Sequence, residues 1–191
     1  MATGDIKGFK EAAGPVYTEV LLNSEFIAKG ATLDAELNLG ENCGIALDTT
    51  LSADGKYSGI VEAGTAGAAL AFGDVCYLAV ADSRWELAKA DVALTSGGVK
   101  LGICVLAAAG DGSTTKMMLW GKINAAAKFP TLTVGAVVYL SAATAGVVVA
   151  GASNATTGQP AATNNVIRVM GYGNTADELF FNPSSDYITH T

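Results

Sequence analysis

The side chains that could carry out acid–base or metal chemistry are few and scattered along the chain. His190 is the one histidine of the sequence and is its penultimate residue. A general base that works near neutral pH is most often histidine, and zinc sites of this kind need three or four clustered His or Cys ligands. The sequence therefore argues against a catalytic triad and against a histidine-based zinc site.

The cysteines give no sign of a metal site or of a disulfide framework. Cys43, Cys76 and Cys104 are odd in number, lie far apart and form no CxxC motif. Cys76 and Cys104 stand in apolar segments, where a buried thiol behaves as a small hydrophobic side chain. We predict free structural thiols, which suit a reducing compartment.

The acidic and glycine-rich segments resemble turns more than ligand sites. "GDGSTTK", residues 110–116, lacks the Gly-Lys-Ser/Thr order of a phosphate loop and precedes a predicted strand, so it predicts a β-turn. Neither a calcium loop nor a carboxylate pair for glycoside hydrolysis can be recognised. Most of the aspartates neighbour predicted turns, namely Asp54, Asp74, Asp82, Asp91, Asp111, Asp177 and Asp186.

The aromatic side chains offer the remaining candidates for a binding site. A platform on which sugars or bases stack is one interpretation, but aromatic residues in strands more often pack in a core or across strands. We favour packing for the set Trp85, Trp120, Tyr77, Tyr139, Tyr172, Phe180 and Phe181. We expect no catalytic, cofactor-binding or metal-binding residues, and a protein that is not an enzyme.

The amino-acid composition of the chain restricts the kinds of partner that it could bind. The 191 residues are 50% hydrophobic and 15% charged, with a net charge of −7. An acidic chain without clustered Lys and Arg is a poor ligand for nucleic acid or anionic membrane, and we expect neither. We also expect neither a signal peptide nor a transmembrane span. So few charges predict a surface covered in part by copies of the chain or by a larger assembly.

The positions of apolar segments and turns predict an all-β fold, a β-sandwich or barrel. Residues 1–58 differ from the rest and predict an N-terminal arm or small subdomain, with Asp54-Gly55 as a hairpin turn. From residue 59 to 191, short segments rich in Val, Ile, Leu, Tyr and Thr alternate with turn residues. The predicted strands are 60–62, 75–80, 84–89, 100–106, 115–123, 137–141, 146–150, 166–172 and 178–182.

This region contains an internal repeat, about 73–123 and 135–182. Gly73 and Tyr77 align with Gly135 and Tyr139 at an offset of 62 positions, and the same offset aligns Trp85 with Val147. Each copy predicts a hairpin, a strand, a turn and a closing strand. We expect two four-stranded units packed face to face, with the loops 91–99 and 151–165 at corresponding rims.

Several segments resemble the β-module of tailed-bacteriophage structural proteins. They are "GDVCYL", "RWELAKAD", "LGICVLAAAGDGSTTKMMLWGKI", "VGAVVYLS" and "VIRVMGYGNTADELFFNPSSDYI", which together span about residues 60–188. The module occurs in capsid decoration or cement proteins and in head and tail fibres. The resemblance implies a non-enzymatic component of the virion, commonly trimeric, anchored to a capsid or fibre. The chain shows no stalk repeat or coiled coil, which favours a compact protein of the capsid surface.

The expected function is therefore that of a capsid decoration or cement protein, made in the host bacterial cytoplasm and located on the outer surface of the phage head. Its partners would be the major capsid protein and itself, as a homotrimer. Residues 1–58 would supply or brace the contact with the shell. The alternative is a head- or tail-fibre module whose rim loops bind a host surface glycan; a polysaccharide depolymerase is the third interpretation.

Overall fold

The computed structural model describes residues 41–42, 44–152 and 157–191, and the chain divides into two compact units between Gly44 and Ile45. The described strands and the described helix all lie in the unit Ile45–Thr191. Cys43, residues 1–40 of the predicted arm and residues 153–156 of the predicted rim loop lie outside the described residues.

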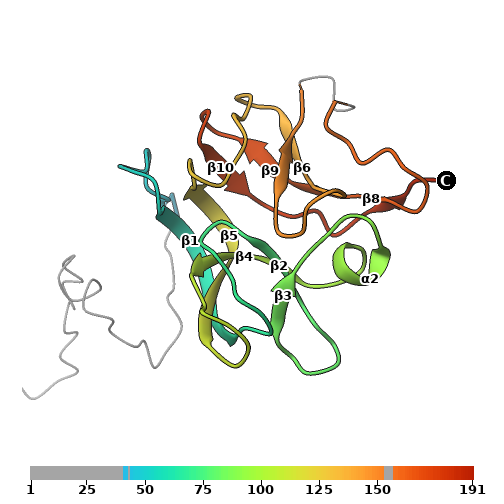
Figure 1. Ribbon diagram of the computed structural model, residues 1–191. Coiled ribbons are helices and arrows are strands. Elements are labelled where there is room, and N and C mark those ends of the chain that lie inside the picture. The colour runs from blue at the N-terminus through green and yellow to red at the C-terminus, as the bar shows by residue number, and fades with distance from the viewer. Residues whose placement is uncertain (1–40, 43, 153–156) are drawn as a thin grey trace, which may run out of the picture. The chain divides into compact units, whose positions relative to one another are not determined.

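The fold is all-β, as the sequence predicts (Figure 1). Its one described helix is α2 (Ala93–Ser96), and no described helix has the length and apolar character needed to cross a membrane. The strands are β1 (Lys56–Thr65), β2 (Val75–Leu78), β3 (Trp85–Leu87), β4 (Leu101–Leu106), β5 (Thr114–Asn124), β6 (Val137–Leu140), β7 (Val148–Ala150), β8 (Val166–Ile167), β9 (Val169–Gly173), β10 (Glu178–Phe181) and β11 (Ile188–Thr189).

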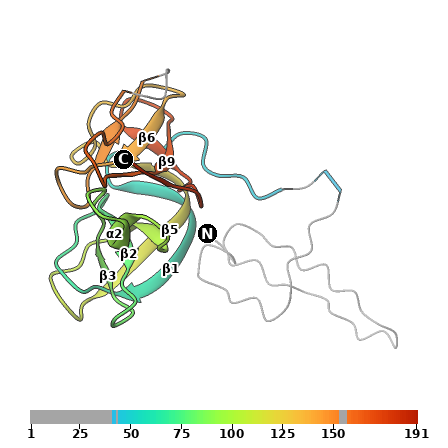
Figure 2. The same ribbon diagram turned by 90° about the vertical axis from the view of Figure 1, so that its right-hand side faces the viewer.

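The two predicted repeats form two four-stranded units of the same connectivity. The sheet order is β3-β2-β4-β5 followed by β10-β9-β6-β7, so the second unit has its equivalent strands in reverse order. The units meet edge to edge, through antiparallel pairing of β5 with β10, and not as two separate sheets. The sheet curls into a half-barrel (Figure 2). Side chains of both units therefore meet in one core.

Backbone pairing corrects the alignment of the two repeats by one residue in the hairpins. Cys76 pairs with Leu87 in the first unit, whereas the equivalent Val138 pairs with Ala150 in the second. The offset is therefore 62 in the first strand of each hairpin and 63 in the second, because the second turn is one residue longer. Trp85 accordingly corresponds to Val148, not to Val147.

One long ribbon, β1 with β5, connects the units. The first half of β5 pairs with β4 and its second half with β10, while β1 pairs along its whole length. The ribbon is irregular between Ile60 and Val61, beside the facing glycines Gly59 and Gly121. A Cβ on Gly121 would lie 2.3 Å from the carbonyl oxygen of Ser58, and its φ of +142° also favours glycine.

The predicted boundary at residue 58 falls inside β1, and the compact unit that contains the sheet begins at Ile45. Asp54 and Gly55 do form a turn, and Gly55 has a φ of +74°. No hairpin results, because the described segment before the turn has no strand pairing and β1 pairs with β5 instead. Leu51 of that segment is buried against the β unit.

The first unit is buried on both faces of its sheet. One face contributes Val75, Ile103 and Met118 to the core shared with the second unit. The other face packs Cys76, Cys104, Met117 and Trp85 into a separate cluster. A strand buried on both sides is apolar throughout, which explains the continuous run "LGICVL" of β4.

Candidate interaction surface

The two described thiols are part of the core, and the backbone of His190 is part of a strand pair. Cys76 and Cys104 are free and fully buried, and the Cys76 Sγ–H donates to the Asp74 carbonyl oxygen over 3.6 Å. Burial raises the pKa of both thiols. At His190 the backbone N–H donates to the Asn165 carbonyl oxygen over 2.8 Å, extending the pairing of β11 with β8.

Two of the predicted turn aspartates pair with basic side chains. "GDGSTTK" contains the predicted β-turn: the Ser113 N–H donates to the Gly110 carbonyl oxygen over 3.1 Å, and β5 follows. The Asp111 carboxylate pairs with Arg84. The buried Asp74 pairs with Lys128. Among the described residues, no group of three or more His, Cys, Asp and Glu side chains could hold a metal ion.

The predicted rim loop 91–99 is anchored by a buried arginine. The Arg168 guanidinium donates to the carbonyl oxygens of Ser96 at 3.1 Å and Val99 at 3.0 Å, and its Nε donates to Ser184 at 2.7 Å. Burial lowers the pKa of Arg168. The sequence predicts one strand over residues 166–172, but Arg168 divides this segment into β8 and β9. The first pairs with β11 in a two-stranded sheet, and the second belongs to the nine-stranded sheet. The loop is therefore fixed to the C-terminal segment.

An apolar row crosses the outer face of the second unit and of the β1–β5 ribbon beside it. We call it the outer row: Ile60 on β1, Trp120 on β5, Phe180 on β10, Tyr172 on β9 and Val137 on β6. Ile60 pairs with Trp120, Phe180 with Tyr172, and Tyr172 with Val137. The Trp120 and Phe180 rings meet edge to face, with centroids 5.4 Å apart. Ile60, Tyr172 and Trp120 remain 60%, 44% and 37% exposed.

The equivalent row of the first unit is completely buried. Val75 pairs with Ile103 and Ile103 with Met118, which is the pairing that joins Val137, Tyr172 and Phe180 in the second unit. All three residues of the first unit are 0% exposed, because the second unit packs on them. Nothing among the described residues covers the corresponding face of the second unit to the same degree.

A strap, residues 45–51, crosses one end of this face. The Asp48 N–H donates to Ser58 Oγ over 3.0 Å, and the Leu51 N–H donates to Glu178 Oε2 over 3.2 Å. The Lys122 ammonium donates to the carbonyl oxygens of Asp48 at 2.9 Å and Thr49 at 3.0 Å. The charge of Lys122 is therefore engaged by the backbone of the strap.

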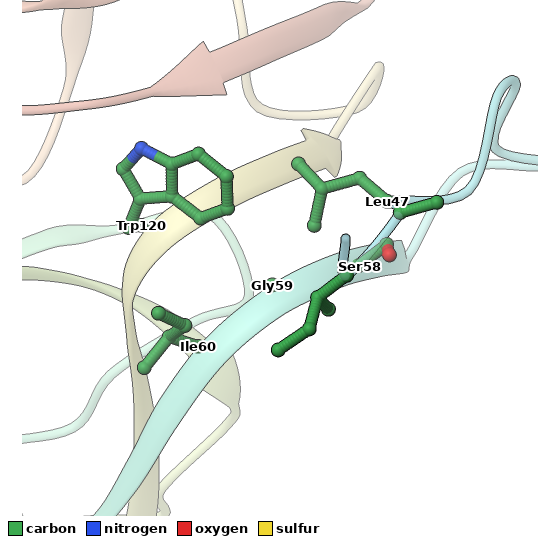
Figure 3. A pocket seen from close by; sticks show the side chains of 7 residues that line it. Leu47, Ser58, Gly59, Ile60 and Trp120 are labelled. Atoms are coloured by element: carbon green, nitrogen blue, oxygen red, sulfur yellow. The ribbon is translucent and has the colours of Figure 1, made fainter. Parts of the chain in front are cut away.

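The strap and the outer row enclose an open apolar pocket of about 320 Å³. Figure 3 shows the side chain of Leu47 reaching toward the indole of Trp120, with Ile60 beside it. The other lining residues are Ile45, Ala46, Ser58 and Gly59. Ser58 is the polar side chain of the lining, and its Oγ already accepts from the Asp48 N–H. The pocket therefore suits an apolar group, and its lining contains no base that could activate the Ser58 hydroxyl.

The structure separates the predicted aromatic set into two groups. Trp85, Tyr139 and Phe181 are buried, as the packing interpretation predicts. Trp120 packs across strands against Phe180, which that interpretation also allows, but Trp120 and Tyr172 remain substantially exposed. No sequence signal distinguishes the exposed rings, since all of these residues lie in strands of similar composition.

Comparison of the chain with protein-family models, with curated proteins and with solved structures gave no match. What the chain does must be argued from its own residues and geometry.

Proposed function

We propose that the chain is a structural protein of a phage virion, a capsid decoration or cement protein that binds the outer surface of the head. Its partners are the major capsid protein and further copies of itself, as a homotrimer. It acts by mass action, because a ligand that binds only the assembled shell stabilises that shell.

The observation that carries this proposal is the contrast between polar and apolar side chains. The carboxylates of Asp74 and Asp111 pair with Lys128 and Arg84 within the fold. The outer row, by contrast, leaves large apolar side chains uncovered. A small acidic β-domain with such a face fits a component of an assembly better than a catalyst. The sequence resemblance to phage β-modules supports the same conclusion.

The test is binding of the full chain to undecorated heads of the phage that carries its gene. We expect saturable co-sedimentation and a rise in the melting temperature of the heads. At a free concentration about 100 times the Kd, each occupied site stabilises the shell by about 2.7 kcal/mol. Heads already saturated with the protein are the control and should bind no more. Failure to co-sediment with undecorated heads would refute the proposal.

A second candidate function, recognition of a host surface glycan by a fibre module, is favoured by one observation. Trp120 and Tyr172 present exposed aromatic rings, and sugars stack on such rings. The position differs from the predicted one, because Arg168 anchors the loop 91–99 and the exposed aromatic residues lie on the outer row.

A glycan array probed with the full chain separates the two functions. A fibre module would bind a defined glycan, and the Trp120→Ala variant would lose that binding while its far-ultraviolet circular dichroism stayed unchanged. A decoration protein would bind heads and no glycan.

A further inference from the structure

We propose that the outer row is the surface on which a second copy of this chain packs. The proposed function includes self-association, and this inference, which rests on that part of it, names the surface through which two copies meet. It assigns the contact to Ile60, Trp120, Phe180, Tyr172 and Val137.

The internal repeat supports a contact of this kind. In the first unit, Val75, Ile103 and Met118 are buried by apolar side chains from the sheet of the second unit. In the second unit, the equivalent Tyr172 is 44% exposed. In the first unit, therefore, the equivalent row is covered by aliphatic and aromatic side chains of a β-sheet of the same protein. A sheet of a second copy could cover the outer row in the same way.

The outer row also lies next to that buried contact. Met118, inside the contact between the units, and Trp120, in the outer row, lie two residues apart on β5. Their partners on β1, Val61 and Ile60, are adjacent. The outer row therefore begins within two residues of the internal interface, at the irregularity between Ile60 and Val61, and a second copy on the row would lie next to an interface that the fold already builds.

The net charge of the chain also favours the outer row as the contact between copies. The chain has a net charge of −7, so two copies repel each other unless they meet where carboxylates are absent or paired. The outer row contains no charged side chain. At its borders, Lys122 is bound to the strap, and Glu62 pairs with Lys100 at 2.7 Å. An aromatic centre with a polar rim is the usual composition of a protein interface.

Light scattering on the full chain over a dilution series tests the proposal. The wild type should show a molar mass two or three times the 19.3 kDa of one chain and dissociate on dilution. Tyr172→Lys and Ile60→Lys place a charge in the contact, and each should raise the dissociation constant by about 30-fold or more. The matched control is Leu94→Lys on α2, which changes an apolar side chain that is 79% exposed and outside the row.

Trp120 provides a second readout that does not depend on a variant. Trp85 is buried within the chain, so changes in acrylamide quenching on dilution report Trp120. We expect stronger quenching in the dissociated protein. A wild type that is monomeric at every concentration would overturn the inference, as would an oligomer that survives Tyr172→Lys and Ile60→Lys with Trp120 still accessible.

These outcomes are independent of the capsid test. A protein that self-associates through the outer row but ignores heads would refute the proposed function and leave this inference standing. A protein that binds heads as a monomer would overturn this inference and the homotrimer, and would leave the binding to the capsid standing.

Discussion

The two tryptophans of the chain should differ sharply in their contribution to stability. Trp85 is 1% exposed, and its indole lies against two glycines: a Cβ on Gly64 would come within 2.5 Å of its Nε1, and one on Gly102 within 3.2 Å of its Cη2. Neither glycine has a side chain that could move into the space left by the indole. We therefore expect Trp85→Ala to cost about 4 to 5 kcal/mol, the upper part of the range for such truncations.

Trp120→Ala should cost much less in the dissociated protein. Its side chain is already 37% exposed, and the main interaction that the substitution removes is the edge-to-face packing with Phe180. Such a pair contributes about 0.5 to 1.5 kcal/mol beyond buried area. With the partial burial added, the expected loss of stability is about 1 to 2 kcal/mol. By this reasoning the two variants should differ by about 3 kcal/mol.

The measurement is urea unfolding followed by far-ultraviolet circular dichroism, at a concentration where the wild type is dissociated. Circular dichroism reports the sheet and does not depend on the fluorophore that each variant removes. Equal losses of stability for the two variants would refute the reasoning, because they would place Trp120 in a core as closed as that around Trp85.

Three further perturbations follow from the packing and hydrogen bonds. Gly121→Ala should cost at least about 2 kcal/mol because of its φ and the close Ser58 carbonyl, whereas Gly110→Ala, with no atom within 4 Å of a new Cβ, should change urea stability by less than about 0.5 kcal/mol. Arg168→Met should leave several buried carbonyl groups without donors and cost about 3 kcal/mol or more; a loss of stability under about 1 kcal/mol would show that water replaces the guanidinium. The buried thiols Cys76 and Cys104 have raised pKa values, so above about pH 8.5 the unfolded chain loses protons that the folded chain keeps, and stability should fall by up to about 1.4 kcal/mol per pH unit for each thiol. Thermal melts above about pH 8.5 should show that stability falls less steeply with pH in a variant with Cys76 and Cys104 both changed to Ala. An equally steep fall in that variant would show that other groups cause the pH dependence.

The strands and turns of the β unit could be predicted because their signals are local. The segments 75–80, 100–106 and 115–123 differ from β2, β4 and β5 by only a few terminal residues. Gly73 and Gly135 have φ values of +86° and +75°, so equivalent turns of the two repeats carry equivalent glycines. A short apolar segment with a turn residue at each end is sufficient to predict such an element, whatever it packs against.

Pairing between distant strands could not be predicted in the same way. The one-residue difference between the hairpins depends on turn length, and an alignment by similar residues misses it. The join of β5 with β10, and the division of segment 166–172 at Arg168, depend on interactions with residues far along the chain. A local pattern contains no information on those partners.

By itself, the sequence determined that the chain is acidic and contains an internal repeat, and it predicted the all-β fold that the structure shows. Only the tertiary structure decided which copy of the repeated row is covered. Val75, Ile103 and Met118 are buried because the other unit packs on them, while Tyr172 stays exposed. The physical reason is that alternation along a strand shows that a residue faces one side of a sheet. Whether that side meets another sheet or solvent depends on how the whole chain curls.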